Sequence, residues 1–334
     1  MTLNSEEKNY DEFLKTRFIS GSFLQSSIWR DFLKAQKLNT WQAAIIENNQ
    51  TIAVCLFYEN KLPLDRSYLY APKGPIIDNG LSDQKKQEAL ALILSKVRDV
   101  TKETRQREEI FLTTELEDIM FLLPEFKKSP DVQPRDTWIL DLDKDTKDIL
   151  EEMHTKTRYN IALAKRRGVK IKFSNQAEDL KYFLKLISKT ACRNQISVHS
   201  DNYYALLWQN LVKHGAGQLA LAELDGKIIT ANIIIKFGSA VTYLHGASDY
   251  NYRKHMAPHL LQWETIKQAK EQGFKIYDFW GIAPEDDSKP SWRGFSRFKR
   301  SFGGRPIKAA GAYDLIYNKT WYSIYKLSKK ILKR

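Results

Sequence analysis

The order of predicted helices and strands occurs twice along the chain, and this repetition constrains the fold most strongly. In each half, a helix precedes an alternating hairpin, a third strand, a second helix and a fourth strand. The first set comprises Ser27 to Gln36, 41–58, 67–72, a long helix from Ser82, and 109–116. The second set comprises 201–215, 218–237, 241–247, Ala257 to Glu271, and 275–282. Both halves therefore predict the order α-β-β-β-α-β.

Turn residues mark the hairpin in each half. Asn48-Asn49 and Asp225-Gly226 interrupt alternating apolar runs, and these residue types tolerate positive φ. The third strands end in the similar sequences YLYA and YLHGA. We predict an α/β protein (α+β) of two similar domains that arose by duplication, each a mixed sheet flanked by helices with an acetyltransferase-like (GNAT-like) core. Two unrelated segments with the same order are the alternative.

The expected domains are residues 1–142 and 143–308. A linker from Asp141 to Asp148 is followed by a helix and by a strand from Val169. Residues 309–334 are expected to pack back on the first domain, because Ala310 to Tyr317 predicts a strand that delivers a final amphipathic helix there. The lysine-rich side of that helix leaves contact with an anionic membrane surface as the alternative.

Composition limits the class of protein. The 334 residues carry a formal net charge of +13, which favours a polyanionic partner. The acidic N-terminus is unlike a signal peptide, and the longest apolar run, Ile52 to Tyr58, cannot span a bilayer. Cys55 and Cys192 fit no zinc spacing, which suits a reducing compartment. We expect a cytoplasmic protein, with peripheral contact at the inner membrane as an option.

No cofactor and no metal are predicted. His255 and His259 are four residues apart, but Pro258 lies between them near the helix start, and a third ligand is not apparent.

Two segments are strongly basic. In 292–308 cations alternate with aromatic residues, and we predict a strand-like or irregular conformation in which Arg297 and Lys299 share one face. The other segment, 155–171, is predicted to be a helix rich in lysine and arginine. Two such patches in one domain indicate phosphate contacts with a nucleotide or RNA. A solvated loop and an exposed helix face are the alternatives.

Five sequence motifs in order carry a family resemblance: FLQSSIWRDF, APKGPIID, TRYNIALAKRRGV, the long run from YLHGASDYNYRKH to KIYDFWGI, and RFKRSFGG. They resemble the FemABX family of non-ribosomal peptidyltransferases, which transfer an amino acid from aminoacyl-tRNA to the peptidoglycan stem peptide. That family has two acetyltransferase-like domains, in agreement with the repeat. Some members carry a long helical arm, whereas this chain resembles the compact, armless FemX-like type.

The resemblance implies catalytic roles for Lys299, Phe298 and Glu115. Aminolysis of an ester needs a neutral amine and stabilisation of an oxyanion. Lys299 would stabilise that oxyanion or bind the terminal phosphate of the tRNA, and Phe298 would order the adenosine or the loop. Glu115 would orient the acceptor amine or cap its strand.

The resemblance also implies binding residues. Lys34 and Arg193 would hold precursor phosphates, with His199 standing where the family has arginine. Tyr243, His245 and His255 would line the cleft, and Trp280 would contact substrate. The expected tRNA contacts are Arg293, Arg297, Arg300, Arg305, Arg158, Lys165 and Arg166.

The expected function is therefore aminoacyl transfer by a monomer. Its partners would be aminoacyl-tRNA and a muropeptide precursor, either UDP-MurNAc-pentapeptide or lipid II. An acyl-CoA-dependent N-acyltransferase of the same fold is one alternative, although the glycines of RSFGG are wrongly placed for a pyrophosphate loop. A non-catalytic RNA- or envelope-binding protein is another.

Overall fold

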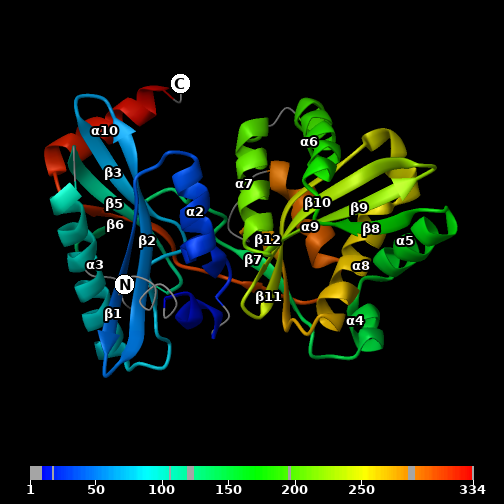
Figure 1. Ribbon diagram of the computed structural model, residues 1–334, viewed down its shortest axis with the longest axis horizontal. Helices are drawn as coiled ribbons and strands as arrows, with labels where there is room; N and C mark the ends of the chain where they lie inside the picture. The colour runs from blue at the N-terminus through cyan, green and yellow to red at the C-terminus, as the bar shows by residue number, and fades with distance from the viewer. Residues whose placement is uncertain are drawn as a thin grey trace. The chain divides into compact units, whose positions relative to one another are not determined.

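The computed structural model describes residues 10–16, 19–104, 107–118, 124–194, 197–284 and 290–332. The chain divides into two compact units (Figure 1). The first unit comprises residues 1–135 and 308–334, and the second comprises residues 136–307.

The first unit is built on a mixed sheet with the strand order β1-β2-β3-β5-β14-β6, and β4 pairs with β2. Its strands are β1 (Thr40–Glu47), β2 (Gln50–Leu62), β3 (Arg66–Ala71), β4 (Ile76–Ile77), β5 (Glu108–Leu116), β6 (Phe126–Lys128) and β14 (Gly311–Ile316). Its helices are η1 (Ser22–Gln25), α2 (Ser27–Ala35), α3 (Asp83–Thr104) and α10 (Lys319–Leu332). The main core lies between the sheet and α3, and a smaller cluster joins β5 to α10.

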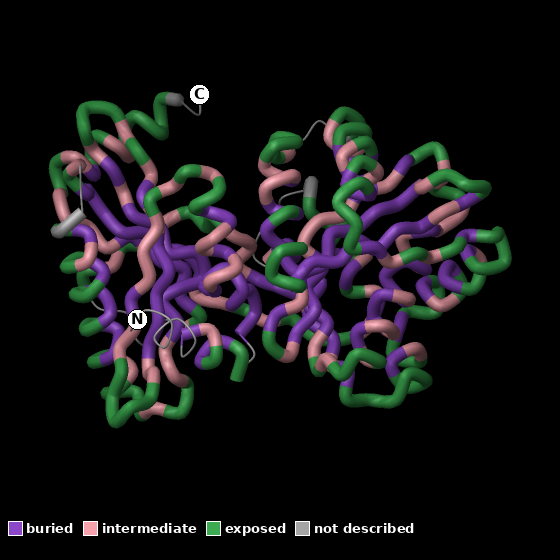
Figure 2. Tube along the Cα trace, viewed as in Figure 1, coloured by how far each residue is buried: buried purple, intermediate pink, exposed green. Residues whose placement is uncertain are grey.

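The second unit has the strand order β13-β7-β12-β11-β10-β9-β8. Its strands are β7 (Thr137–Asp141), β8 (Lys170–Ser174), β9 (Gly217–Leu224), β10 (Lys227–Phe237), β11 (Ala240–Ser248), β12 (Ile276–Gly281) and β13 (Arg305–Ile307). Its helices are α4 (Thr146–Glu152), α5 (Thr155–Arg166), η2 (Ala177–Asp179), α6 (Leu180–Asn194), α7 (Asp201–Lys213), η3 (Tyr250–His255), α8 (Ala257–Glu271) and α9 (Pro290–Arg300). In each unit the buried residues follow the strands (Figure 2).

The two sheets repeat one pattern, which confirms the predicted fold class. In β1-β2-β3-β5 and in β9-β10-β11-β12, two antiparallel pairings are followed by one parallel pairing. Both predicted hairpin turns have positive φ, at Asn48 and Asn49 and at Asp225 and Gly226. The duplication is thus visible as strand order as well as in the sequence.

The ends of the units differ from the expected boundaries in one respect. The strand β7 lies before the expected boundary at residue 142, yet it pairs with β12 and β13 of the second sheet. The chain returns to the first unit through β14, which pairs with β5 and β6, and α10 then packs on β5.

The prediction of a strand-like or irregular conformation over residues 292–308 is wrong up to Arg300, because Pro290–Arg300 forms the helix α9, whereas Arg305–Ile307 does form a strand. Proline suits the first turn of a helix, and the segment contains no β-branched residue that would favour a strand. Arg297 and Lys299 therefore do not share a face. Helical spacing instead places Arg293, Arg297 and Arg300 together on the exposed side, while Lys299 is buried.

Candidate functional site

The parallel strands β11 and β12 of the second unit separate early. Their ladder has three pairs and ends at Thr242 and Asp278. Beyond this point β11 bulges, so that Tyr243 and His245 oppose consecutive residues of β10. Trp280 on β12 has a φ of 64°, a left-handed conformation that costs free energy for a bulky residue. The two strands thus leave room for a side chain from another element.

Lys299 of α9 occupies this position. Its side chain is 1% exposed, and its Nζ donates a hydrogen bond of 2.7 Å to the carbonyl oxygen of Gly281. The same nitrogen lies 3.9 Å from the ring centroid of Phe295 and 5.5 Å from that of Tyr243. Burial lowers the pKa of Lys299 well below its usual value, and the buried carboxylate of Asp278 opposes this shift. Lys299 is therefore a buried hydrogen-bond donor held in surroundings that disfavour its charged form.

A hollow of about 360 Å³ adjoins this lysine, because Tyr243 and Phe295 belong to its wall. The wall also contains Arg193, Gln262 and Phe298. A smaller hollow of about 150 Å³ shares Phe298 with it. The combination of aromatic rings, an arginine and a buried amine suits a ligand that has a flat base and an anionic group.

Glycine is required at one point of the wall. A Cβ atom on Gly246 would lie 1.9 Å from the hydroxyl oxygen of Tyr243. Gly246 therefore lets the Tyr243 ring lie flat against the bulged strand β11. Gln262 accepts a hydrogen bond of 2.6 Å from the Tyr277 hydroxyl, which fixes the amide beside the hollow.

The structure brings four of the predicted residues together at this hollow: Lys299 and Phe298 from α9, Arg193 from α6 and Tyr243 from β11. Trp280 is buried, and neither Trp280 nor His255 belongs to the walls of the two hollows as described. Sequence reasoning missed Phe295, Gln262 and Gly246. Gln262, within the sequence Gln262-Trp263-Glu264, and the glycine after His245 were visible in the sequence but had no assigned role.

His199 belongs to an aromatic cluster. Its ring stacks on Tyr203 at 3.8 Å and meets the ring of His245 edge-on at 6.0 Å. Burial lowers the pKa of His199, and burial together with His199 lowers the pKa of His245 to about 3. Both imidazoles are therefore neutral near pH 7, so the expected phosphate contact of His199 would lack a positive charge.

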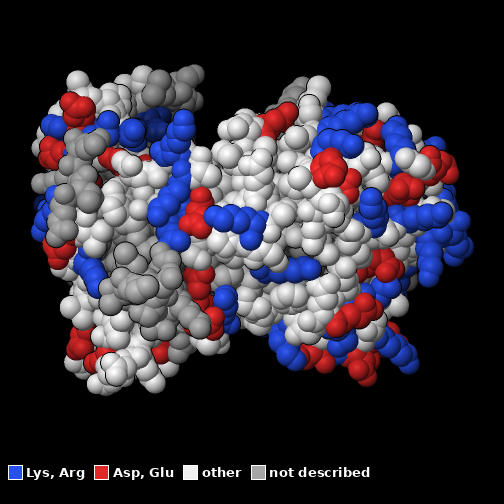
Figure 3. All heavy atoms as spheres, in the orientation of Figure 1, with Lys and Arg blue, Asp and Glu red and all other residues white. Residues whose placement is uncertain are grey.

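The predicted tRNA contacts fall into two groups. Arg158, Arg300 and Arg305 have partners within the second unit. Arg158 donates to the carbonyl oxygens of Glu151 and Met153, Arg300 donates to that of Ala283, and Arg305 forms a surface ion pair with Asp141. The side chains of Arg293, Arg297, Lys165 and Arg166 are exposed on α9 and α5. On the face drawn in Figure 3, basic and acidic side chains alternate along the edges of the second unit.

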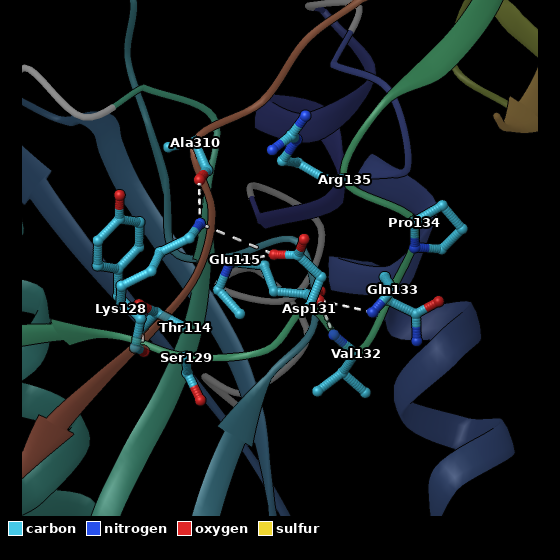
Figure 4. A network of polar contacts seen from close by, with 12 residues as sticks. Thr114, Glu115, Lys128, Ser129, Asp131, Val132, Gln133, Pro134, Arg135 and Ala310 are labelled. Carbon is cyan, nitrogen blue, oxygen red and sulfur yellow. Dashed lines mark hydrogen bonds and ion pairs between the residues drawn. The ribbon is translucent and has the colours of Figure 1, made fainter. Parts of the chain in front are cut away.

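Glu115 lies in the interior of the first unit (Figure 4). One carboxylate oxygen accepts hydrogen bonds from the Tyr70 hydroxyl at 2.8 Å and the Lys73 amide at 3.1 Å. The other accepts from the amides of Val132 and Gln133 at 3.1 and 2.6 Å. A carboxylate with four donors has little capacity left for a substrate, so the geometry favours the structural alternative for Glu115.

Lys34 lines a separate hollow of about 310 Å³ in the first unit, together with Arg30 and Lys96. Arg30 binds Asp31 and Gln42, and Lys96 donates to the carbonyl oxygen of Ala44. Among these three described cations, Lys34 is the one whose ammonium has no hydrogen bond or ion pair. It is available for an anion.

The sequence matches the FemAB family at residues 5–113, 91–227 and 212–330. This chain belongs to the FemAB family. It is 25% identical to the lipid II:glycine glycyltransferase of Staphylococcus epidermidis, with 98% of this chain and 95% of the relative covered. It is 26% identical to the UDP-N-acetylmuramoylpentapeptide-lysine N(6)-alanyltransferase of Weissella viridescens, with 84% and 86% covered.

The fold of this FemAB protein is that of the crystal structure of FemX, with a TM-score of 0.83, 20% identity, and 95% and 98% of the two chains covered. The alignment with the glycyltransferase extends over 406 positions, more than the 334 residues of this chain. That relative therefore contains inserted segments, and the predicted resemblance to the compact FemX-like type is confirmed.

Proposed function

We propose that this FemAB protein is an aminoacyltransferase that moves an amino acid from an aminoacyl-tRNA to the stem-peptide amine of a muropeptide precursor. Two relatives support this reaction by name, a glycyltransferase of lipid II and an alanyltransferase of UDP-N-acetylmuramoylpentapeptide-lysine. The observation that carries the proposal is Lys299, a buried amine beside a hollow walled by aromatic rings and Arg193. We expect a small amino acid, Ala, Ser or Gly, to be added to the ε-amine of the third residue of the stem.

The reaction is the aminolysis of an ester. The nitrogen of the acceptor amine bonds to the ester carbonyl carbon, and the carbonyl oxygen becomes an oxyanion. The bond to the tRNA 3′ oxygen then breaks, and a proton from the amine ends on that oxygen. A donor held in a site of low dielectric stabilises an oxyanion strongly, and this is the proposed role of Lys299 Nζ.

The remaining residues bind the two substrates. Phe298, and Phe295 beside it, would stack on the terminal base of the tRNA, since base stacking on aromatic rings tolerates any sequence. Arg293, Arg297, Lys165 and Arg166 would contact its phosphates. Lys34 and Arg193 would hold phosphates of the precursor, whether UDP-linked or lipid-linked. The protein would work in the cytoplasm as a monomer without a cofactor.

The test supplies purified protein with a mixed pool of charged tRNAs and, in separate reactions, UDP-MurNAc-pentapeptide or lipid II. Mass spectrometry should find a precursor heavier by one aminoacyl residue. Lys299→Met should abolish most of this product. If neither precursor gains mass, the proposal is wrong, and acetyl transfer from acetyl-CoA in a parallel reaction would support the acyltransferase alternative instead.

A further inference from the structure

Helix α10 exposes a row of aliphatic side chains. Ile324, Leu327 and Ile331 are 49%, 61% and 63% exposed. Their spacing of three and four residues places them on one side of the helix. The helix is held to the first unit by other residues: Tyr322 is buried, and Trp321 and Tyr325 pack with it against Ile110 and Phe111. The aliphatic row therefore contributes little to the fold.

Lysines border this row. Lys319 and Lys330, which share a side of the helix next to the aliphatic residues, are exposed, and so is Lys329. Lys326 instead pairs with the buried Asp314 at 3.1 Å and helps to hold the helix in place. The helix thus presents an aliphatic strip and a cationic strip side by side, on a firmly attached base.

The hairpin between β2 and β3 adds to this surface. Arg66 in the hairpin lies 4.6 Å from the ring centroid of Trp321 on α10, and Tyr68 lies 5.8 Å from Tyr325. Leu64 at the tip of the hairpin is 72% exposed, and Lys61 beside it is also exposed. An exposed leucine and a lysine therefore occur again near the N-terminal end of the helix.

We infer that α10 docks the protein on the surface of an anionic lipid bilayer. Aliphatic side chains enter the boundary between headgroups and acyl chains, and neighbouring lysines are attracted to anionic headgroups. A nucleic acid would be recognised by arginines and exposed aromatic rings, as on α9, and the exposed row of α10 has neither. Since none of the described helices is long and apolar enough to cross a bilayer, the contact would be peripheral.

The experiment measures co-sedimentation of the purified full chain with vesicles of phosphatidylglycerol and phosphatidylcholine, and with phosphatidylcholine alone. Wild type should bind the anionic vesicles, and binding should weaken as salt rises. The triple variant I324S/L327S/I331S should bind at least about tenfold more weakly. K319E/K330E should bind at least about fivefold more weakly. Circular dichroism and thermal unfolding would show that the variants are folded.

A matched control comes from α3, where Leu92 is 55% exposed. Leu92→Ser should leave vesicle binding unchanged, while Leu327→Ser should reduce it. The inference is overturned if wild type binds no vesicles, if Leu92→Ser weakens binding as much as Leu327→Ser, or if the folded triple variant binds anionic vesicles as well as wild type. Sedimentation needs no transfer activity, so a failure here is distinguishable from a failure of the proposed reaction.

Discussion

The two units share a strand order but treat their parallel strand pair differently. In the first unit, β3 and β5 stay paired from Arg66 and Glu108 to Ala71 and Thr114. In the second unit, the ladder of β11 and β12 ends after three pairs. At the ends of β3 and β5, buried side chains of the first unit hydrogen-bond to one another and to the backbone. In the second unit, the Lys299 side chain lies between β11 and β12 beside a hollow.

The buried side chains near the ends of β3 and β5 in the first unit are polar, and their hydrogen bonds are made within that unit. The buried amide of Gln25 donates to the carbonyl oxygens of Leu56 and Pro72 and accepts from the Leu56 amide at 2.6 Å. Glu115 binds four donors at the end of β5. One topology therefore gives either a satisfied carboxylate or a buried amine beside a hollow, depending on a few side chains near the ends of the parallel strands.

The largest expected effect tests the reactive half of this comparison. Lys299→Met should lower kcat by about 10²- to 10³-fold, because a donor to the oxyanion is lost. The matched control is Lys73 of the first unit, whose buried side chain also donates to a carbonyl oxygen, that of Pro134. Lys73→Met should leave kcat within about threefold of wild type. Equal losses in both variants would contradict the assignment of the site to the second unit.

The same substitution, Lys299→Met, should raise the free energy of unfolding although it lowers kcat. Because burial lowers the folded-state pKa of Lys299, the unfolded chain holds the proton more tightly, and stability rises with pH between the folded and unfolded pKa values. Lys299→Met should be more stable than wild type by about 1–3 kcal/mol at pH 7, since methionine avoids the cost of burying or deprotonating the amine. This advantage should shrink towards pH 10. Urea denaturation across that range measures it, and a constant difference would mean that Lys299 does not titrate there.

Substitution of Glu115 in the first unit should lower the stability of the protein rather than its activity. Glu115→Gln replaces one acceptor oxygen by an amide group facing backbone N–H donors, and should lower the free energy of unfolding by about 2–4 kcal/mol. The kcat of the folded fraction should remain within about threefold of wild type. A variant that is as stable as wild type but inactive would restore the role of orienting the acceptor amine.

Much of the fold was predictable because its signals are local. The hairpins at Asn48-Asn49 and Asp225-Gly226 follow from turn chemistry, and both lie where expected. Helix α9 was missed because cations and aromatic residues alternate there, and this alternation resembles a strand more than a helix. The helical period of Arg293, Arg297 and Arg300 was present in the same residues.

The geometry of the site could not be predicted in the same way. Lys299 is buried because β11 bulges beside Tyr243 and separates from β12, which depends on pairing between distant strands. Glu115 is satisfied by donors from residues 70–73 and 132–133, which the sequence order does not bring together. Motif resemblance identified both residues, but only tertiary contacts distinguish a buried amine beside a hollow from a carboxylate that already binds four donors.

Alanine substitutions at two glycines, Gly246 and Gly74, should have effects of intermediate size. Gly246→Ala would push a Cβ atom into the Tyr243 hydroxyl and move that ring within the hollow, so kcat/KM should fall by about tenfold. In the first unit, a Cβ on Gly74 would lie 2.4 Å from Gln25 Nε2. Gly74→Ala should therefore reduce stability, measured by thermal unfolding, with little change in kcat/KM for the folded enzyme. If Gly74→Ala instead lowered kcat/KM while Gly246→Ala lowered only stability, the substrate would lie against β3 and β5 of the first unit.

The smallest expected effect concerns the exposed cations of the second unit. Arg297→Ala should weaken tRNA binding by only a few fold at low salt, and should lower the slope of log affinity against log salt by about 1. Lys102, an exposed lysine of α3 in the first unit, is the control, since it pairs with the exposed Asp99 at the surface. Lys102→Ala should leave the slope unchanged. Fluorescence anisotropy between about 50 and 200 mM salt resolves the two variants. If the slope changed equally in Arg297→Ala and Lys102→Ala, the tRNA would be attracted by the net charge of the whole chain. Helix α9 would then not be a specific tRNA contact.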